Sequence, residues 1–123
     1  MRWLAAGQVV IVAAGTGNPF FTTDTAGVLR AIELGADVIL KGTKVDGVYD
    51  DDPMKNPSAK RFESLTYREI LTRNLKVMDA TAISLSQEND LPIVVFDVTR
   101  RGDLLRIVEG QPVGTLVAKG VVT

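Results

Sequence analysis

The segment AGTGNPFFTTD (Ala14–Asp24) directly follows the apolar run VVIVA and groups residue types that suit an anionic ligand. Gly15 and Gly17 let backbone amides approach a ligand closely. Thr22 and Thr23 stand where a helix is expected to start, and the amides and dipole of a helix start favour an anion such as phosphate. The spacing therefore fits a phosphate cradle at the end of a strand.

Aromatic and acidic side chains complete this segment. Phe20 and Phe21 offer flat surfaces for a base, and Asp24 would place a carboxylate close to a bound phosphate. The segment matches neither the dinucleotide fingerprint nor the P-loop pattern. A glycine turn, a threonine-capped helix and two core phenylalanines would explain the same residues equally well. Both interpretations stay open on these residues alone.

A second polar segment, Thr43–Phe62, follows another apolar run. Lys41 and Lys44 flank its start and could neutralise phosphate oxygens, while Tyr49 could stack on a base. The adjacent triple aspartate lacks the ligand spacing of an EF-hand loop. Taken alone, these lysines and aspartates fit a solvated loop without a ligand better than a binding site.

The composition narrows the possible chemistry. The chain has 123 residues with no His and no Cys, which removes the commonest general base and any thiolate chemistry. Phosphoryl transfer suits the remaining side chains, because it depends on positioning and charge neutralisation. A net charge of −1 gives no reason to expect binding to nucleic acid or an acidic membrane. Without a signal-peptide pattern or a bilayer-length apolar run, the expected location is the cytoplasm.

Short apolar runs alternate with helical patterns along the chain. Unalternating β-branched runs suit strands buried on both faces of a parallel sheet, and they fall at Val9–Val12, Val38–Leu40 and Ile93–Phe96. Helices are expected at about Asp24–Leu34, Thr66–Arg73, Met78–Asn89 and Gly102–Gly110, with a closing strand at Gly114–Val117. This order predicts one α/β domain over residues 1–123, with three α/β/α layers and a mainly parallel sheet.

The two polar segments are expected at one edge of that sheet. Thr43–Phe62 is too polar and turn-rich to belong to the core, and long loops in compact domains are often functional. Ligands of open α/β sheets bind beyond the carboxyl ends of the strands. Because Gly15–Asp24 and Thr43–Phe62 both follow strands, the sequence predicts a ligand site between them.

Two helix starts carry polar residues with a structural explanation. Thr66 and Glu69 form a capping-box pattern. Asp79 stands at the start of the next helix, and an N-cap role would explain it. In that helix, Met78, Ala82 and Leu85 are expected to line one side, and Thr81, Ser84 and Glu88 the other. Ser84 and Ser86 have no base partner in the sequence, so a nucleophilic role is not predicted for them.

Five motifs together resemble the bacterial uridylate (UMP) kinases, a branch of the amino-acid kinase family. They are GTGNPFFTTD (Gly15–Asp24), LKGTKVDGVYDDDP (Leu40–Pro53), LTYREIL (Leu65–Leu71), LKVMDATA (Leu75–Ala82) and LPIVVF (Leu91–Phe96). They occur in the family's order and span about Gln8 to Val117. Other branches of the family lack the Pro-Phe-Phe-Thr-Thr run. The resemblance implies the amino-acid kinase-like fold and the reaction ATP + UMP to ADP + UDP in pyrimidine nucleotide biosynthesis.

The resemblance also implies roles for individual residues. The family's UMP-binding segment matches Thr16, Gly17, Asn18, Pro19, Phe20, Phe21, Thr22 and Thr23. Positions that contact ATP match Thr43, Tyr49 and Asp52, with Lys41 and Lys44 in the same motif region. Asp24 matches a carboxylate that organises basic groups around the transferring phosphoryl, and Asp79 matches a second acidic position in the site. Mg²⁺ would arrive with ATP and bridge its phosphates, with no protein-only metal site.

The resemblance covers only the C-terminal half of such an enzyme. The family's lysine–glycine loop over the ATP phosphates and its GGGN segment on the UMP side have no match here. We therefore expect impaired or absent kinase activity from this half alone. The N-terminal half would be lost naturally, by truncation of the gene or by a misassigned start codon. The alternative is a non-catalytic nucleotide-binding or oligomerisation module. The family implies hexamers and a response to GTP and UTP.

Overall fold

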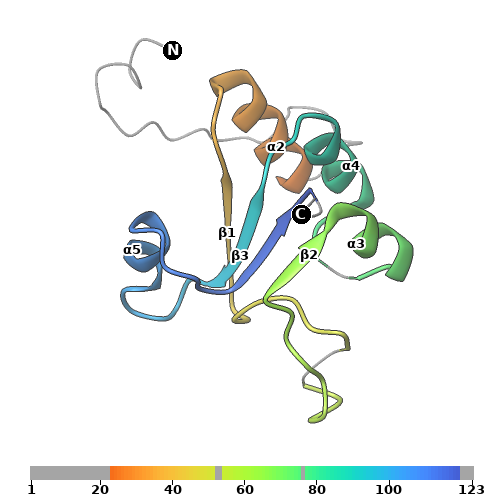
Figure 1. The fold of residues 1–123 in the computed structure, drawn as a ribbon, viewed down its shortest axis with the longest axis vertical. Helices are drawn as coiled ribbons and strands as arrows, with labels where there is room; N and C mark the ends of the chain where they lie inside the picture. Colours follow the sequence, from red (N-terminus) through yellow and green to blue (C-terminus); the bar gives the residue numbers. More distant parts are fainter. Residues whose placement is uncertain (1–22, 52–53, 76, 120–123) are drawn as a thin grey trace.

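The computed structural model describes residues 23–51, 54–75 and 77–119, and in them one sheet holds four strands (Figure 1). The strands are β1 (Ile39–Thr43), β2 (Ser64–Thr66), β3 (Ile93–Asp97) and β4 (Thr115–Ala118). Their spatial order is β1-β3-β4-β2. β1 runs parallel to β3 and β2 parallel to β4, whereas β3 and β4 are antiparallel. The predicted α/β fold with a mainly parallel sheet is confirmed; the expected strand at Val9–Val12 lies outside the described residues.

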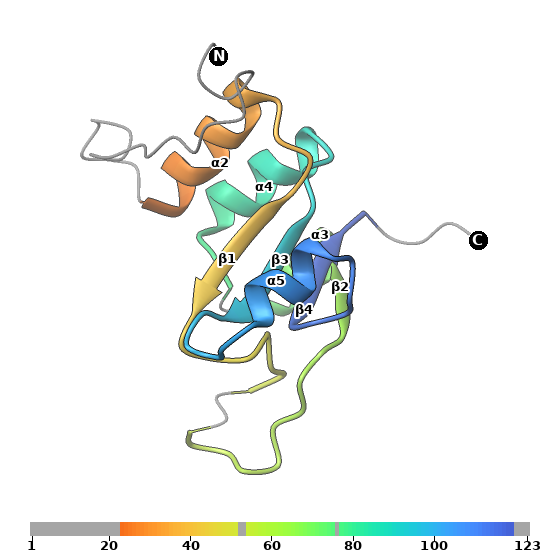
Figure 2. The same cartoon turned by 90° about the vertical axis from the view of Figure 1, so that its left-hand side faces the viewer.

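Helices lie on both sides of this sheet. They are α2 (Thr23–Leu34), α3 (Tyr67–Arg73), α4 (Ala80–Glu88) and α5 (Asp103–Val108). Figures 1 and 2 show α2, α3 and α4 together on one side and α5 on the other, which gives the three layers expected from the sequence. No helix in the described ranges has the length and apolar character needed to cross a bilayer.

The start of α3 has the predicted capping box. The Thr66 hydroxyl accepts the Glu69 N–H at 3.1 Å, and the Glu69 carboxylate accepts the Thr66 N–H at 3.3 Å. Leu65 and Ile70, on either side of the cap, are both buried. The helix ends where Asn74 adopts a left-handed conformation with φ of 52° and donates its N–H to Ile70 O. Local sequence therefore specifies both ends of α3.

The buried residues of α4 do not coincide with the apolar side expected from the sequence. Ala82 is buried as expected, but Ile83 and Ser86 are fully buried and Leu85 is only half-buried. The reason is that α4 packs against both α2 and α3, so its buried face turns toward the groove between them. The Ser86 hydroxyl donates to Ala82 O at 2.9 Å, which satisfies it within the helix.

The segment Thr43–Phe62, called the excursion below, is more ordered than its composition suggests. Tyr49 and Arg61 form an antiparallel bridge. Phe62 N–H donates to Val48 O at 2.8 Å, and Asp50 N–H donates to Lys60 O at 3.0 Å. Val48 is 4% exposed and joins the core, so the expectation that this segment contributes nothing to the core was wrong. β2 directly follows the excursion and was not predicted, because a three-residue strand with one apolar side chain leaves no periodic signal.

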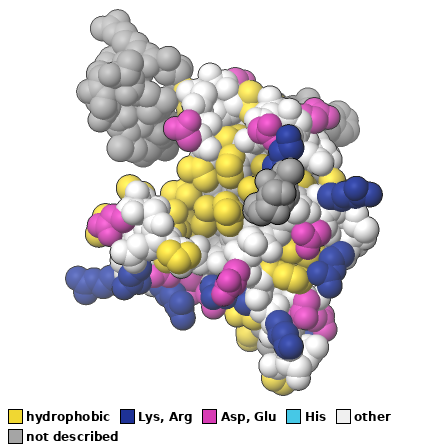
Figure 3. All heavy atoms as spheres, viewed as in Figure 1, with side chains coloured by type: hydrophobic (Ala, Val, Ile, Leu, Met, Phe, Trp, Pro, Cys, Tyr) yellow, Lys and Arg dark blue, Asp and Glu magenta, His cyan; other side chains and the backbone are white. Residues whose placement is uncertain are grey.

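The main core lies between the sheet and the layer of α3 and α4. Its buried members are Val48, Leu65, Tyr67, Ile70, Ile83, Ile93, Val95 and Val117. The described residues cover the opposite side of the sheet less, and Figure 3 shows hydrophobic side chains gathered over the middle of the sheet next to α5. On α5 itself, Leu104, Leu105 and Val108 are exposed. The two faces of the sheet are therefore buried to different degrees.

Candidate nucleotide site

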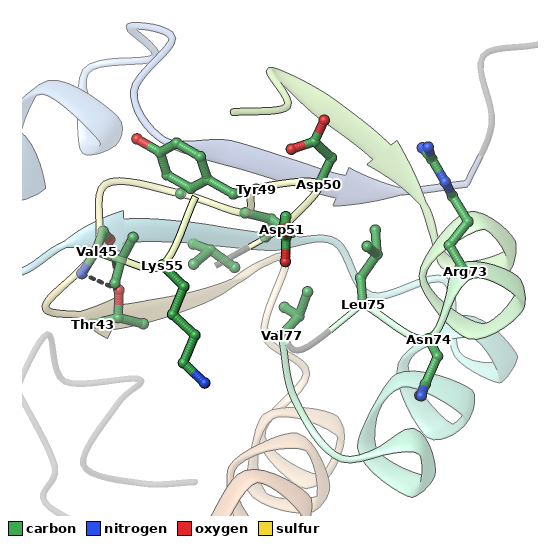
Figure 4. Close-up of a pocket in the computed structure, with 13 residues that line it drawn as sticks. Thr43, Val45, Tyr49, Asp50, Asp51, Lys55, Arg73, Asn74, Leu75 and Val77 are labelled. Atoms are coloured by element: carbon green, nitrogen blue, oxygen red, sulfur yellow. Dashed lines mark hydrogen bonds between the residues drawn. The ribbon is translucent and has the colours of Figure 1, made fainter. Parts of the chain in front are cut away.

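A pocket of about 500 Å³ opens at the carboxyl end of β1, between the excursion and the segment that joins α3 to α4 (Figure 4). It is lined by Thr43, Val45, Gly47, Val48, Tyr49, Asp50, Asp51, Lys55, Arg73, Asn74, Leu75, Val77 and Val95. This is the edge at which ligands bind in open α/β sheets. Its position agrees with the edge predicted from the sequence.

The pocket combines an apolar interior with charged groups. Valines from β3 and the excursion and the side chains of Leu75 and Val77 supply the apolar part. Figure 4 shows Lys55 reaching from the excursion and Arg73 projecting from the end of α3. The Arg73 guanidinium also lies 5.2 Å from the centre of the Phe62 ring. An apolar cavity with a few charged groups suits a ligand with a flat apolar part and an anionic part.

Thr43, which lines this pocket, is held by hydrogen bonds to Val45 two residues later. Its hydroxyl accepts the Val45 N–H at 3.0 Å and donates to Val45 O at 2.6 Å. The hydroxyl also lies 3.3 Å from Phe96 O on the neighbouring strand. These contacts fix the direction in which the chain leaves β1, and so they place the first residues of the excursion along the pocket.

Tyr49 lies on the excursion side of the pocket. Its hydroxyl donates to Asp46 Oδ1 at 2.7 Å. That hydrogen bond, with smaller contributions from burial and the Asp46 charge, raises the pKa of Tyr49 above its ordinary value, while Arg61 and Arg100 lower it. The neutral phenol is therefore the form present near neutral pH, and its ring is held by a partner three residues away.

Asp24 and Lys41 meet beside the pocket, although they are 17 residues apart in sequence. Lys41 Nζ lies 2.9 Å from Asp24 Oδ1 and donates to Val77 O at 2.9 Å. Both side chains are partly buried, with 22% of Lys41 and 30% of Asp24 exposed. Through Val77, which lines the pocket, the ion pair connects the first turn of α2 to the pocket wall.

Other residues singled out in the sequence have different positions. Lys44 is exposed and does not line the pocket. Asp79 occupies the N-cap position of α4 as predicted, but its side chain makes no capping hydrogen bond, so the capping role was wrong. Thr23 begins α2. The remaining predicted residues, Thr16, Gly17, Asn18, Pro19, Phe20, Phe21, Thr22 and Asp52, lie outside the described residues.

The sequence reasoning missed several residues that line the pocket. Leu75 and Val77 belong to the motif LKVMDATA but received no role, because apolar residues between two helices resemble ordinary core. Asn74 gave a usable signal, since Asn after a basic last turn favours a left-handed helix end that turns the chain sharply. Lys55 gave none, because a lysine in a polar loop is normally solvated.

The described residues contain no group of three or more His, Cys, Asp or Glu side chains that could hold a metal ion.

Comparison with known proteins gives consistent matches. The model of the amino acid kinase family matches residues 1–97. A uridylate kinase of Magnetococcus marinus is 64% identical over 111 residues, which cover 90% of this chain and 46% of that protein.

The crystal structure of UMP kinase from Bacillus anthracis superposes with a TM-score of 0.95 at 40% identity, covering 98% of this chain and 50% of that chain. UMP kinase from Ureaplasma parvum gives a TM-score of 0.89 at 43% identity, with coverages of 96% and 51%. The chain thus spans about half the length of the relatives it matches.

Proposed function

We propose, from the premise that this chain belongs to the amino acid kinase family, that it is the nucleotide-binding part of a uridylate kinase, which transfers a phosphoryl group from ATP to UMP in pyrimidine nucleotide synthesis. The observation that carries the proposal is the Asp24–Lys41 ion pair, 2.9 Å long and joined to the pocket wall through Val77 O. The similarity to named uridylate kinases supports the choice of substrates.

ATP would occupy the pocket at the carboxyl end of β1. Its volume of about 500 Å³ lies within the usual range of ligand pockets. The adenine ring would contact the apolar interior, with Tyr49 and Thr43 beside it, and Asp52 would complete this side. Lys55 would face the phosphates, because it is a cation among the lining residues, whereas the Arg73 guanidinium lies over the Phe62 ring.

The transferred phosphoryl would lie next to Lys41. An ammonium group has three N–H donors, and Asp24 and Val77 O accept two hydrogen bonds from this one. The third donor would be available to a phosphoryl oxygen. In the reaction an oxygen of the UMP phosphate attacks the γ-phosphorus, the bond to the bridging oxygen of ADP breaks, and ADP leaves. Asp24 would orient Lys41 for that step, which depends mainly on positioning and charge neutralisation.

UMP would bind along residues 16–23, which lead directly into α2 and Asp24. Asp79 would supply a second carboxylate from the start of α4. Mg²⁺ would arrive with ATP and neutralise phosphate oxygens, since it usually keeps few protein ligands. When bound, it supplies charge stabilisation to the leaving and transferred groups.

A second candidate function is a non-catalytic nucleotide-binding or oligomerisation module. A module would bind nucleotide and show no turnover. For the kinase, we extend the proposal to a cytoplasmic location, assembly into a homo-oligomer of the family's hexameric type, and regulation by GTP and UTP.

Titration calorimetry of Mg-ATP and then UMP, followed by an assay of UMP-dependent ADP formation, tests these proposals on the 123-residue chain. We expect saturable binding of Mg-ATP. Lys41→Met should weaken it about tenfold or more, since a charge-assisted hydrogen bond to phosphate is lost. Lys60→Met is the matched control, because Lys60 is an exposed lysine outside the pocket.

Three outcomes separate the alternatives. Binding with turnover supports the kinase, and binding without turnover supports the module. A folded chain that gives no heat with either nucleotide would overturn both. Equal loss of affinity in Lys41→Met and Lys60→Met would remove the proposed role of the ion pair.

A further inference from the structure

Thr115, the first residue of β4, is a buried polar residue that the proposed reaction does not use. Its side chain has no exposed surface. A buried hydroxyl needs hydrogen-bond partners, because an unsatisfied one is costly. The partners of Thr115 lie 67 and 53 residues earlier in the sequence, and both belong to the excursion.

The Thr115 hydroxyl forms hydrogen bonds with two parts of the excursion, at Val48 and at Phe62. It accepts the Val48 N–H at 2.9 Å and donates to Phe62 O at 2.5 Å. Phe62 N–H in turn donates to Val48 O at 2.8 Å. The three hydrogen bonds form a closed ring of Thr115, Val48 and Phe62. In this ring the Thr115 hydroxyl takes the place of a backbone partner for the Val48 N–H and the Phe62 carbonyl. The hydroxyl uses both its donor and an acceptor site, so it cannot be replaced by an apolar group of the same shape without loss.

Close packing around the ring adds a second constraint. A Cβ placed on Gly47 would lie 2.5 Å from Thr115 Oγ1 and 2.9 Å from Arg61 Cδ. Only glycine therefore allows the chain to pass so near this hydroxyl. The backbone at Gly47 and Val48 is held against β4 both by hydrogen bonding and by contact.

The held residues are the ones that form one side of the pocket. Gly47, Val48 and Tyr49 are consecutive lining residues. Thr115 itself does not line the pocket, so it acts on it only through the excursion. We infer that Thr115 is a positioning residue that fixes the Tyr49 side of the nucleotide pocket, an inference that rests on the proposed ATP site.

The experiment uses Thr115→Val, which keeps the branched shape and removes the hydroxyl, and Thr115→Ser, which keeps the hydroxyl. Amide hydrogen exchange of Val48 and Phe62 reports the ring without any nucleotide. We expect these amides to exchange about tenfold faster in Thr115→Val and at nearly the wild-type rate in Thr115→Ser. Mg-ATP affinity should fall about tenfold in the valine variant and recover in the serine variant.

The outcomes keep the inference apart from the proposed function. Wild-type protein that binds no nucleotide overturns the proposed function and with it the pocket role of Thr115. Nucleotide binding that is equal in wild type and Thr115→Val, or unchanged exchange at Val48 and Phe62, overturns the inference alone. If Thr115→Val does not fold, Thr115→Ser decides: native exchange and affinity support the inference, and faster exchange overturns it. In an active assembly, the KM for ATP should rise while the KM for UMP stays constant.

Discussion

The excursion and α5 depart from their compositions in opposite directions. The excursion is polar and rich in turn residues, yet it places Val48 in the core with 4% exposure. The helix α5 is rich in leucine and valine, yet Leu105 and Val108 are 61% and 71% exposed. Composition alone would have reversed the two assignments. The difference is that the excursion is held by hydrogen bonds within itself and to the Thr115 side chain of β4.

The two segments are attached to the sheet in different ways. Backbone bonds at Val48, Asp50 and Phe62 and the Thr115 hydroxyl attach the excursion to itself and to β4. After α5 the chain returns to the sheet through Gly114, whose ideal Cβ position lies 2.0 Å from Val95 O. A ligand site that needs fixed groups is therefore better placed on the excursion than on α5.

The largest loss of unfolding free energy is expected from a substitution at Gly114, where the chain returns from α5 to the sheet. Gly114 has φ of 74° and no room for a Cβ, so Gly114→Ala should cost about 3–5 kcal/mol of unfolding free energy. Gly110 has φ of 85° but nothing within 4 Å of its Cβ position, so Gly110→Ala should cost only about 1–2 kcal/mol. Urea denaturation measures both. Equal costs would show that the close approach to Val95 is not the constraint.

A smaller loss of unfolding free energy is expected at Val48, the buried valine of the excursion, and almost none at Leu105, an exposed leucine of α5. Val48→Ala removes buried methyl groups and leaves a cavity, and it should cost about 2 kcal/mol. Leu105→Ala removes more carbon atoms from an exposed site and should change the unfolding free energy by less than about 0.5 kcal/mol. Thermal and urea unfolding of the two variants decide the ranking. A larger loss for Leu105→Ala would indicate that α5 is covered in solution.

Replacing the core tyrosine, Tyr67, should change the unfolding free energy by about 1 kcal/mol and alter its dependence on pH. Tyr67 is buried and donates its hydroxyl to Leu91 O. Burial, with a smaller effect from Asp90, raises the pKa of Tyr67 above its ordinary value of 10.0. The folded state therefore holds this proton more tightly, and the stabilisation is complete below pH 10 and lost as the pH rises through the folded-state pKa. Tyr67→Phe should lose about 1 kcal/mol at neutral pH and flatten this alkaline decline; an unchanged decline would assign it to another group.

The smallest effect is expected on the pKa of Tyr49, the tyrosine of the excursion. Hydrogen bonding to Asp46, and to a lesser degree burial, raises the pKa of Tyr49. Asp46→Asn removes the charged acceptor, so the pKa of Tyr49 should fall toward its ordinary value. The chain has two tyrosines, and an ultraviolet titration of the Tyr67→Phe background follows Tyr49 alone. Arg68→Gln, at an exposed site on α3, is the matched control.

Local patterns predicted the elements well, and long-range packing accounts for the errors. The capping box at Thr66 follows from neighbouring residues, so the sequence identifies it. The buried face of α4 depends on two partner helices, which no local period records. β2 is stabilised by pairing with β4 far along the chain, and its three residues carry no signal of their own.

The candidate site shows the same division. Thr43 and Tyr49 were predicted as site residues, and the structure brings both to one pocket. Asp24 and Lys41 were predicted separately, and their ion pair depends on how α2 lies against β1. Leu75, Val77 and Lys55 were missed because their side chains carry no chemistry that distinguishes them from core or surface. The Asp79 side chain departs from the expected cap although its backbone position fits.

The strand order β1-β3-β4-β2 has a consequence for the time course of folding. In the described sheet β2 pairs only with β4, and β4 also completes the edge of β3. Because the ribosome releases the chain from its N-terminus, residues 64–66 emerge well before residues 115–118, their partners. The β1–β3 pair can form early, but the sheet joins into one unit only when β4 inserts. Closure over such sequence distances is slow, so the excursion would be attached late, and the pocket would be among the last parts of the chain to mature.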